Sequence, residues 1–356
     1  MDIDTVDIDL DQNAVVIIDQ TKLPNDIVLK KLRSPKEIWD AIYKLEVRGA
    51  PAIGVCAAFG IYVIAKDLAK DFFEDEEGFF KAFYEQKEYL DSSRPTAVNL
   101  SWALNRMASV LESHRGEARA VQVEALKDES IAIRDEDIFV CKRIGEYGVT
   151  LLKDGDGVLT HCNAGKLATV RYGTATSPIY VAKEKGLHIR VYCDETRPLL
   201  QGARLTAFEL FESGVDTTLL CDNMSSALMK EGKVNAIFVG CDRVAANGDT
   251  ANKIGTSVVA AVAKQYHIPM YIAAPTSTID MNCKSGDDIV IEQRDGAEVT
   301  DMWYEKPMAP KGVKVFNPAF DVTDYELIAG IVTEYGIAKA PYSESLKEIF
   351  RKKNNS

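Results

Sequence analysis

The sequence predicts an α/β protein with a mainly helical N-terminal domain that carries a short β element, followed by a C-terminal Rossmann-like domain with a doubly wound parallel sheet. Two observations support this fold class. Residues 35–125 show mainly helical spacing of apolar residues, whereas short apolar runs alternate with helical segments from about residue 155 onward. The length of 356 residues suits two domains of roughly 100–200 residues each. We expect them to span 1–125 and 126–356, with the active site between them.

The N-terminal domain is expected to open with short strands and to continue with helices. The segment NAVVIID at 13–19 alternates in the manner of a strand. A helix is expected to begin after Ser34 and Pro35, because serine is a favoured N-cap and proline suits the first turn. The acidic stretch at 66–91 mixes charges with aromatic residues and indicates a solvated helical face.

The longest uncharged run in the chain has 17 residues and lies between Arg48 and Lys66. This length is at the lower limit for a membrane-spanning helix, about 17–25 residues. The run contains Pro51, and its helical spacing continues into the charged segment KDLAKD. We therefore expect a buried helix of the core here, and not a membrane span.

The C-terminal domain contains five short apolar runs that predict buried parallel strands. They are GVLTHC (157–162), IRVYC (189–193), TTLLC (217–221), NAIFVG (235–240) and PMYIAA (269–274). The segments between them predict helices: LATVRYGTATSPIYVAKEKG, ARLTAFELFESG, SSALMKEG and GTSVVAAVAKQY. This alternation predicts an open sheet with helices on both faces. Region 126–153 is the expected connection between the domains.

Ligands of open parallel sheets bind beyond the carboxyl ends of the strands, so the residues at those ends are the first site candidates. Here they are Cys162-Asn163, Asp194-Glu195, Asp222-Asn223, Asp242-Arg243 and Pro275-Thr276. A single aspartate at a strand end commonly caps the next helix. The recurrence of such residues at consecutive strands favours a site over simple capping.

The segment GCDRVAANGDTANKIGTSVV (240–259) is the most informative stretch. A strand is expected to end at Asp242, followed by a polar loop, Lys253 and a helix that begins near Gly255. Small residues let the backbone approach a ligand, and free N–H groups at the helix start favour a phosphate. The alternative is a long polar loop with a solvated lysine, and both interpretations stay open for this stretch alone.

Two arginines precede further helix starts. Arg48 lies before the Gly-Ala-Pro turn of VRGAPAIG, and Arg94 lies before the proline of SSRPTAVNLSWAL. Either arginine alone could be a surface cap. Arg48, Arg94 and Lys253 together fit a phosphorylated small molecule bound between the two domains.

Composition and missing motifs exclude several functions. The formal net charge of −12 argues against nucleic-acid or anionic-membrane binding, because phosphate groups repel such a surface. Seven cysteines without a C-x-x-C pair argue against a disulfide framework or a structural zinc site. The chain lacks the motifs G-x-G-x-x-G, G-x-x-x-x-G-K-[ST], G-x-S-x-G and H-E-x-x-H, and its N-terminus does not resemble a signal peptide. We expect a cytoplasmic protein.

Seven blocks in chain order carry a family resemblance: RGAPAIG, SRPTAVNL, THCNAG, DETRPLLQGARLTA, DNMSSALM, GCDRVAANGDTANKIGT and NPAFDVT. They closely resemble the methylthioribose-1-phosphate isomerase family, from about residue 14 to residue 340. That family belongs to a larger group with ribose-1,5-bisphosphate isomerases and the regulatory subunits of the translation-initiation guanine-nucleotide exchange factor.

The resemblance implies which residues act. Cys162 and Asp242 would be the catalytic pair, and the substrate contacts would be Arg48, Gly49, Ala50, Arg94, Gln201, Asn252 and Lys253. The expected partners are a small phosphorylated sugar and a second copy of the chain in a homodimer, with no nucleic acid, membrane, cofactor or metal. Gln201 enters only through the resemblance, whereas the catalytic pair, Lys253 and the arginines also follow from the residues themselves.

The implied enzyme is an intramolecular oxidoreductase that converts 5-methylthioribose 1-phosphate to 5-methylthioribulose 1-phosphate in methionine salvage. Because the phosphate on the anomeric oxygen blocks ordinary hemiacetal opening, an acid must assist ring opening. Asp242 would be this acid, which requires a pKa above the ~3.9 of a free carboxyl. Burial in an apolar inter-domain cleft would raise it. Cys162 would act on hydrogen transfer between C2 and C1, by proton or by hydride.

One segment departs from the family pattern. After CNAG the chain continues KLATVRYGTATSPIY, with Lys166 where alanine is more usual and a more charged surrounding at Arg171. The group at the substrate 5-position therefore stays open, and 5-deoxyribose 1-phosphate is an additional or alternative substrate. Ribose 1,5-bisphosphate would use the two basic residues for its second phosphate. A non-catalytic regulatory subunit would not need the combined set of Cys162, Asp242 and Asn252-Lys253.

Overall fold

A computed structural model describes residues 3–95 and 97–355. The chain forms two compact units, which we name the helical unit and the sheet unit. The helical unit holds the described residues up to Phe139 together with Lys166–Gly173. The sheet unit holds Val140–Gly165 and the described residues from Thr174 onward. The change of unit at Phe139 falls inside helix α5 (Arg119–Gly148), a continuous helix of 30 residues.

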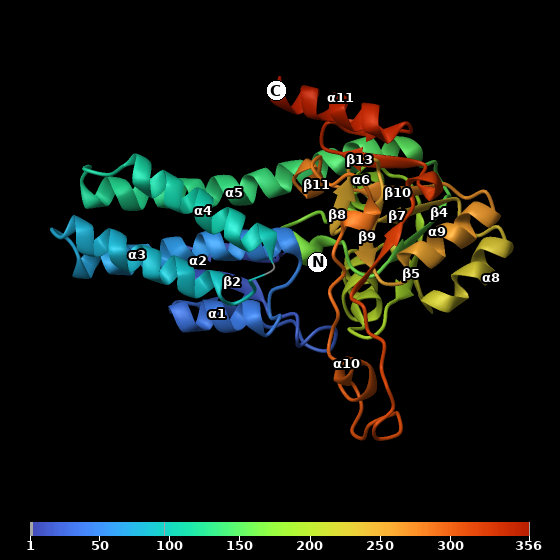
Figure 1. The fold of residues 1–356 in the computed structure, drawn as a ribbon, viewed down its shortest axis with the longest axis horizontal. Coiled ribbons are helices and arrows are strands. Elements are labelled where there is room, and N and C mark those ends of the chain that lie inside the picture. Colours follow the sequence, from blue (N-terminus) through green and yellow to red (C-terminus); the bar gives the residue numbers. More distant parts are fainter. Residues whose placement is uncertain (1–2, 96, 356) are drawn as a thin grey trace. The chain divides into compact units, whose positions relative to one another are not determined.

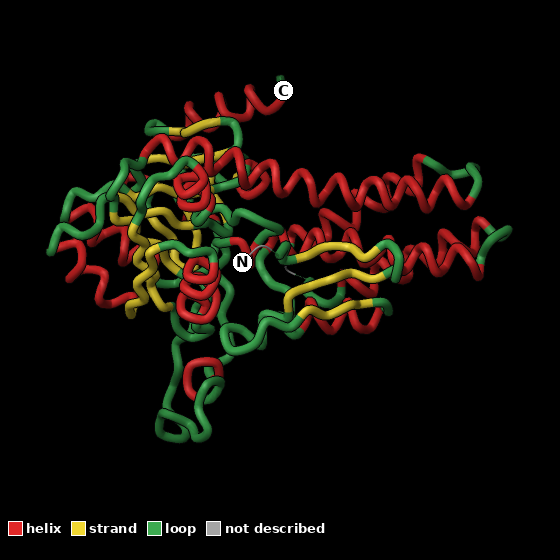
Figure 2. The backbone as a smooth tube through the Cα atoms, turned by 180° about the vertical axis from the view of Figure 1, so that it is seen from behind, coloured by secondary structure: helices red, strands yellow, loops and turns green. Residues whose placement is uncertain are grey.

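The helical unit begins with a three-stranded antiparallel sheet, which is drawn in yellow in Figure 2. Its strands are β1 (Val6–Asp9), β2 (Ala14–Ile18) and β3 (Leu29–Leu32). Helix α1 (Pro35–Tyr43) begins as predicted. The Ser34 hydroxyl accepts from the N–H of Glu37, and the Glu37 carboxylate accepts from the N–H of Ser34, so a capping box fixes this helix start.

Helix α2 (Ala50–Asp71) forms the core of the helical unit, and every residue from Ala52 to Ala65 is buried. It packs against α3 (Glu76–Asp91) and α4 (Val98–Ser113), which run beside it in Figure 1. Among the described residues, α2 alone is long and apolar enough to cross a membrane, but 83% of its most apolar window is buried inside the protein. The prediction of a buried core helix is confirmed.

The sheet unit is built on a seven-stranded sheet in the order β14-β13-β10-β7-β4-β5-β6. The β13–β14 pair is antiparallel and the other neighbouring pairs are parallel. The five predicted strands appear as β4, β5, β6, β7 and β10. The bounds are β4 (Gly157–His161), β5 (Arg190–Glu195), β6 (Asp216–Cys221), β7 (Ala236–Val239), β10 (Met270–Ala273), β13 (Gly330–Thr333) and β14 (Gly336–Ala338).

Alternate residues of the central strands enter two separate apolar cores, one on each face of the sheet. In β7, Ile237 and Val239 belong to the core that includes residues of α8, α9 and α11. Ala236 and Phe238 belong to the core that includes residues of α6 and α7. The helices are α6 (Ser177–Glu184), α7 (Phe208–Glu212), α8 (Ser225–Lys230), α9 (Thr256–Gln265) and α11 (Tyr342–Asn354). The predicted doubly wound sheet is confirmed.

Two predicted elements differ from the structure. Strand β6 was expected to be buried, but it is the edge strand of the sheet and four of its six residues are exposed, because it has a partner on one side only. The helix expected from Leu167 onward begins only at Ser177. The residues before it leave the sheet unit, and the N–H of Val170 donates to the Asp137 carboxylate in the helical unit at 2.7 Å.

Candidate active site

The predicted catalytic residues lie where the strand order of the large sheet reverses. From β4 the chain adds β5 and β6 on one side and β7, β10 and β13 on the other. Cys162 directly follows β4, and Asp242 follows β7, the neighbour of β4 in the sheet. Ligands of open α/β sheets bind at this reversal, beyond the carboxyl ends of the strands. The topology therefore places both residues at the expected ligand-binding edge.

The loops that follow β4 and β7 pack directly against each other at Gly240. A Cβ atom on Gly240 would lie 2.4 Å from the Cβ of Ala164, far inside a normal contact distance. Glycine at this position thus lets the loop that carries Asp242 touch the loop that carries Cys162.

Cys162 is 8% exposed and adopts a left-handed backbone conformation with a φ of 64°. Its thiol donates a hydrogen bond to Oε1 of Gln201, over a sulfur–oxygen distance of 3.2 Å. The structure therefore brings together Cys162 and Gln201, the residue that reasoning from residue types missed. The signal that could have found Gln201 is its position shortly after β5, at the same edge of the sheet.

Polar contacts behind the cysteine hold its loop in place. The Thr206 hydroxyl donates to the Cys162 carbonyl. The Asn163 amide donates to Oγ1 of Thr206 at 3.0 Å and to Oε2 of Glu209 at 3.2 Å. Glu209 is fully buried and also accepts from the Tyr180 hydroxyl at 3.3 Å. A non-glycine residue at positive φ is strained and persists where its surroundings hold it, and these bonds provide that support.

Asp242 opens a β-hairpin where a polar loop was predicted. Its N–H donates to the Ala251 carbonyl at 2.9 Å, and β8 (Arg243–Ala245) pairs antiparallel with β9 (Thr250–Lys253). The hairpin brings the Asp242 backbone beside the end of β9. The side chain of Asp242 is exposed at the start of this hairpin, so the sheet unit by itself does not bury the carboxyl. Its burial in a cleft between the domains stays a prediction.

Asn252 and Lys253 end β9 and form a braced turn with the residues that follow. Asn252 is 7% exposed, and its Nδ2 donates to the Thr256 hydroxyl at 3.0 Å. That hydroxyl donates to the Lys253 carbonyl at 2.7 Å. The Lys253 ammonium lies 5.1 Å from the centre of the Phe320 ring, within the range of a cation–π contact. The turn therefore holds the half-buried Lys253 side chain against Phe320, at the end of the strand that pairs with the Asp242 backbone.

A carboxylate already occupies the start of α9. Asp321 accepts hydrogen bonds from the N–H of Gly255 at 2.8 Å and from the N–H and hydroxyl of Ser257 at 3.2 and 2.8 Å. Asp321 belongs to β12 (Phe320–Thr323), which pairs with β9. The prediction of free N–H groups for a phosphate at this helix start is therefore wrong, because strand β12, which pairs with β9 in a separate four-stranded sheet, brings its own acceptor. Lys253 remains the candidate phosphate contact there.

Arg48, Gly49, Ala50 and Arg94 lie in the helical unit. Gly49 precedes α2 with a φ of 90°, and a Cβ atom there would lie 2.4 Å from the Cα and the carbonyl oxygen of Ala168. Glycine is therefore required at this helix start. Because Gly49 has no side chain, the N-cap position offers no side-chain acceptor to the first N–H groups of α2.

The two arginines stand at the same end of the helical unit, and both are half-buried. Arg48 precedes α2 and Arg94 precedes α4, and the first turns of these helices pack together. A Cβ atom on Gly54 of α2 would lie 3.1 Å from the Asn99 carbonyl oxygen of α4. The structure thus gathers the predicted substrate contacts into one group per unit: a basic group at two helix starts, and the group around Cys162.

The two basic residues of the unusual segment have different surroundings. Arg171 forms a bidentate ion pair with Asp4, with nitrogen–oxygen distances of 2.7 Å for both bonds. Lys166 is 6% exposed and lies in the 3-10 turn η2 (Lys166–Ala168). A second phosphate on a substrate would have to compete with Asp4 for Arg171.

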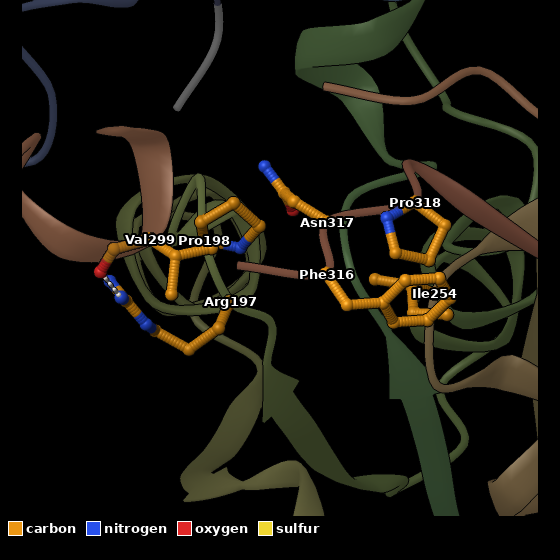
Figure 3. Close-up of a pocket in the computed structure, with 7 residues that line it drawn as sticks. All are labelled: Arg197, Pro198, Ile254, Val299, Phe316, Asn317 and Pro318. Carbon is orange, nitrogen blue, oxygen red and sulfur yellow. Dashed lines mark hydrogen bonds between the residues drawn. The ribbon is translucent and has the colours of Figure 1, made fainter. Parts of the chain in front are cut away.

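A mainly apolar cavity of about 210 Å³ lies in the sheet unit beside residues adjacent to the site (Figure 3). One wall is Ile254, which follows Lys253, and another is Pro198, which precedes Gln201. The outer wall comes from a long excursion of the chain that holds α10 (Ala297–Thr300). The lining residues are Arg197, Pro198, Ile254, Val299, Phe316, Asn317 and Pro318.

The sheet unit offers a thiol, a carboxylate, an amide and the Lys253 cation, and the helical unit offers two arginines. Among the described residues, no group of three or more His, Cys, Asp or Glu side chains is arranged to hold a metal ion. A thiol and a carboxylate suit proton transfer, and arginine and lysine suit a phosphate.

Comparison with known proteins identifies the family of the chain. Residues 46–340 match the Initiation factor 2 subunit family. The chain is 59% identical, over 99% of its length and 98% of the relative, to methylthioribose-1-phosphate isomerase of Symbiobacterium thermophilum. It is 55% identical, over 97% of each chain, to 5-deoxyribose 1-phosphate isomerase of Clostridium botulinum. The solved structure of 5-methylthioribose 1-phosphate isomerase from Pyrococcus horikoshii OT3 has 41% identity and a TM-score of 0.93, over 98% of this chain and 96% of that one. The chain therefore belongs to the methylthioribose-1-phosphate isomerase family, within the Initiation factor 2 subunit family.

Proposed function

We propose that the protein is an aldose–ketose isomerase that converts 5-methylthioribose 1-phosphate to 5-methylthioribulose 1-phosphate in methionine salvage. One observation carries this proposal: the Cys162 thiol, bonded to Gln201, lies on the loop that packs against the Asp242 loop at the reversal of the sheet. A thiol and a carboxylate are the two groups that hydrogen transfer and ring opening require. Relatives named as isomerases of two 5-substituted ribose 1-phosphates add support.

Ring opening is assigned to Asp242. In its protonated form, Asp242 donates to the ring oxygen as the bond between C1 and that oxygen breaks. Hydrogen then moves from C2 to C1, while the C2 hydroxyl loses its proton and becomes the ketone. That released proton replaces the one which Asp242 donated, so the isomerisation balances without a co-reactant. The carboxyl is exposed in the structure, and the bound sugar would shield it from water.

Hydrogen transfer is assigned to Cys162. Gln201 accepts from the thiol at 3.2 Å and so orients the sulfur before the substrate arrives. Two routes fit this arrangement: removal of the C2 proton by the sulfur, or a hydride shift that the sulfur stabilises. Deuterium at C2 separates them, because a proton route exchanges it with water and a hydride route carries it to C1. NMR of the product measures this directly.

Phosphate binding is assigned mainly to the helical unit. Arg48 and Arg94 supply positive charge, and the start of α2 at Gly49 and Ala50 supplies N–H groups and the positive end of a long helix dipole. Anions bind readily at such a helix start. Lys253 and Asn252 of the sheet unit supply the remaining contacts.

The active site is proposed to lie between the two domains, so that neither domain is active alone. Gly49 packs against Ala168, and Ala168 follows Cys162 by only six positions in the chain. Six residues span at most about 22 Å even when fully extended. The chain itself therefore limits how far the start of α2 can be from the catalytic thiol.

The 5-substituent of the sugar is assigned to the cavity beside Ile254 and Phe316 (Figure 3). Its lining is mainly apolar, which suits a methylthio group better than a hydroxyl or a phosphate. The methyl group of 5-deoxyribose 1-phosphate would enter the same cavity and fill it less. We therefore expect both compounds to be substrates, with the methylthio compound preferred.

Two alternatives are less favoured. Ribose 1,5-bisphosphate needs cations for a second phosphate, but Arg171 is held by Asp4. Arg197, which lines the cavity assigned to the 5-substituent, donates to the Val299 carbonyl at 2.6 Å. A non-catalytic regulatory subunit, the other function within the family, would bind a ligand without turning it over. The combination of Cys162, Gln201 and Asp242 at one edge has no purpose in that role.

We also propose that the protein is a cytoplasmic homodimer. On the edge strand β6, Leu219 is 49% exposed, and Phe211 on α7 is 70% exposed. A second copy of the chain would cover apolar groups of this kind. Sedimentation velocity measures the mass, and a monomer at micromolar concentration would contradict this assignment.

Turnover followed by NMR tests the proposed function. The purified protein is mixed in parallel with 5-methylthioribose 1-phosphate, 5-deoxyribose 1-phosphate and ribose 1,5-bisphosphate, and the C2 ketone signal of each product is recorded. We expect conversion of the first two compounds, with the methylthio compound faster. Conversion of none would favour the regulatory alternative, and preference for the bisphosphate would contradict the assignment of the 5-position.

A further inference from the structure

His161, the last residue of β4, precedes Cys162 and belongs to a buried polar network that the proposed reaction does not use. The side chains of His161 and Asp194 are both fully buried, and the two residues are directly paired across β4 and β5. His161 Nδ1 lies 3.3 Å from Oδ2 of Asp194, and Nε2 lies 3.0 Å from the carbonyl oxygen of Ile254. The imidazole thus bridges the strand that precedes Cys162 to the turn that carries Lys253.

Both partners of the imidazole are hydrogen-bond acceptors. A carbonyl oxygen cannot donate, so Nε2 must carry a hydrogen. The Ser225 hydroxyl lies 2.7 Å from Oδ1 of Asp194, which leaves Oδ2 to accept from Nδ1 of His161. An imidazolium paired with a carboxylate satisfies both bonds of the ring and gives charge-assisted hydrogen bonds.

A second carboxylate faces the same ring. A Cβ atom on Gly255 would lie 2.9 Å from Cε1 of His161 and 3.4 Å from Oδ2 of Asp222, so Gly255, the ring and this carboxylate converge. Burial by itself would lower the pKa of His161, but the bond and charge of Asp194, the Ile254 carbonyl and Asp222 outweigh it and raise the pKa. The pKa of Asp194 is also raised, mainly by burial. Both shifts favour one proton shared within the pair.

We propose that His161 is a positioning residue of the isomerase, whose imidazolium holds the Lys253 turn against the strand that precedes Cys162. This inference rests on the proposed function. If the Nε2 bond is lost, the Ile254 carbonyl is released and Lys253 can shift, so phosphate binding weakens. The thiol stays in place, because β4 and the loop contacts from Thr206 and Asn163 do not depend on the ring.

A matched pair of variants separates the two bonds of the ring. Asparagine carries its amide nitrogen where histidine has Nδ1, so His161→Asn keeps the bond to Asp194 and loses the bond to Ile254. Glutamine carries its amide nitrogen where histidine has Nε2, so His161→Gln keeps the bond to Ile254. We expect His161→Asn to raise KM for 5-methylthioribose 1-phosphate about tenfold, with kcat within about threefold. In His161→Gln, KM should stay within about threefold.

Binding of inorganic phosphate, measured by calorimetry, provides the same comparison without turnover. The dissociation constant should rise about tenfold in His161→Asn and little in His161→Gln. Equal changes in the two variants would overturn the positioning role, as would a loss of folded protein with unchanged KM and phosphate affinity in what remains. If the wild-type protein binds phosphate with this pattern but turns over no substrate, the proposed function fails and the positioning of the turn stands.

Nitrogen-15 NMR of the ring gives a readout on the wild-type protein, whatever the variants do. The chain has only four histidines, so the spectrum is simple to assign. Both ring nitrogens of His161 should carry a proton at pH 7. In Asp194→Asn, Nδ1 should lose its proton, because the Ile254 carbonyl still requires a hydrogen on Nε2. A His161 ring with one unprotonated nitrogen in the wild-type protein would overturn the inference.

Discussion

Helices α2 and α9 both begin after a glycine at positive φ that closely follows a basic residue, yet their first N–H groups meet different surroundings. Gly49 has a φ of 90° and Gly255 a φ of 100°. At α9, Asp321 accepts from Gly255 and Ser257 and fills the helix start. At α2, Gly49 offers no acceptor and is pressed against Ala168. A basic residue before a glycine therefore does not identify a phosphate site by itself. An acceptor from a part of the chain far away in sequence, such as Asp321, can already bind the first N–H groups of the helix.

This difference assigns different roles to the two units in the proposed site. We propose that the start of α2 and its arginines bind the phosphate, and the dipole of a 22-residue helix would add to that attraction. The start of α9 is closed by Asp321, so the sheet unit contributes Lys253 as a point charge together with the reacting groups. In the proposed site, the helical unit therefore supplies most of the phosphate contacts, and the sheet unit supplies the reacting groups together with Lys253 and Asn252.

The largest effect should come from removing the reacting groups. We expect Cys162→Ser and Asp242→Asn each to lower kcat at least about a thousandfold, because neither replacement can supply the same proton transfer. The dissociation constant for the substrate should stay within about threefold, since the phosphate contacts remain. The matched control is Cys221→Ser, which changes an exposed thiol at the end of β6 and should leave activity unchanged. Near-normal turnover in either catalytic variant would contradict the account.

Removing the charge before α2 should act on binding and not on chemistry. We expect Arg48→Gln to raise KM by about 10- to 100-fold with kcat nearly unchanged, because a charge-assisted hydrogen bond to a phosphate contributes about 1.5–3 kcal/mol. Steady-state kinetics with 5-methylthioribose 1-phosphate measures this. Arg171→Gln is the control and should change KM by less than about twofold, because Arg171 is paired with Asp4. A larger effect at Arg171 would instead favour the bisphosphate substrate.

Removing the Asp321 carboxylate from the start of α9 tests whether this helix start takes part in phosphate binding. Asp321→Ala removes the acceptor of Gly255 and Ser257, so we expect the free energy of unfolding to fall by about 1–2 kcal/mol, as for a lost N-cap. Urea unfolding gives this value, and Ser257→Ala should cost less because one bond is lost. Phosphate affinity should not increase in Asp321→Ala. Tighter phosphate binding would mean that the α9 start faces the substrate after all.

The pH dependence of the free energy of unfolding tests the buried pair of His161 and Asp194, which holds the Lys253 turn. Because the pKa of His161 is raised in the folded state, the folded protein holds a proton that the unfolded chain releases near pH 6.5. This stabilisation is complete below about pH 6.5 and is lost as the pH rises through the folded-state value. The free energy of unfolding should fall by up to about 1.4 kcal/mol per pH unit in that window. His161→Gln should have a flatter slope between pH 6.5 and 9, and parallel curves would contradict the shared proton.

The smallest effect is expected at the cavity for the 5-substituent. Phe316 is 85% exposed, so Phe316→Ala should fold normally while it opens one wall. We expect kcat/KM for 5-methylthioribose 1-phosphate to fall about fivefold, which corresponds to the loss of roughly 1 kcal/mol of apolar contact. The value for 5-deoxyribose 1-phosphate should change less. The control is Val290→Ala, at a residue 93% exposed that does not line the cavity. An equal fall in kcat/KM for both substrates would contradict the assignment of this cavity to the 5-substituent.

Most of the fold follows from local patterns in the sequence. The apolar runs of β4, β5, β7 and β10 and the buried run of α2 depend on short-range periodicity, which the chain displays openly. The pattern of β6 is apolar as well, but its exposure depends on its place at the edge of the sheet, which no local pattern reports. The late start of α6 has a similar cause, because the segment before it packs in the helical unit.

The site was predictable where it depends on strand ends, and less so where it depends on distant partners. Cys162 and Asp242 could be found because ligands bind at the ends of parallel strands. Gln201 could not be distinguished from other polar residues until its amide was seen beside the thiol. Asp321 lies 66 positions from Gly255 in the chain, so its capping of α9 depends on the pairing of β9 with β12. Asp194, a predicted site candidate, instead binds His161.

Backbone amide NMR of the inactive Asp242→Asn variant, titrated with 5-methylthioribose 1-phosphate, tests the central claim most directly. Labelling alanine, glycine and serine makes the first N–H groups of both helices visible. The account predicts saturable binding in which the N–H signals of Ala50 and Ala52 shift strongly, while those of Gly255 and Ser257, bonded to Asp321, change little. Large shifts at Gly255 and Ser257 with none at Ala50 and Ala52, or no binding at all, would contradict it.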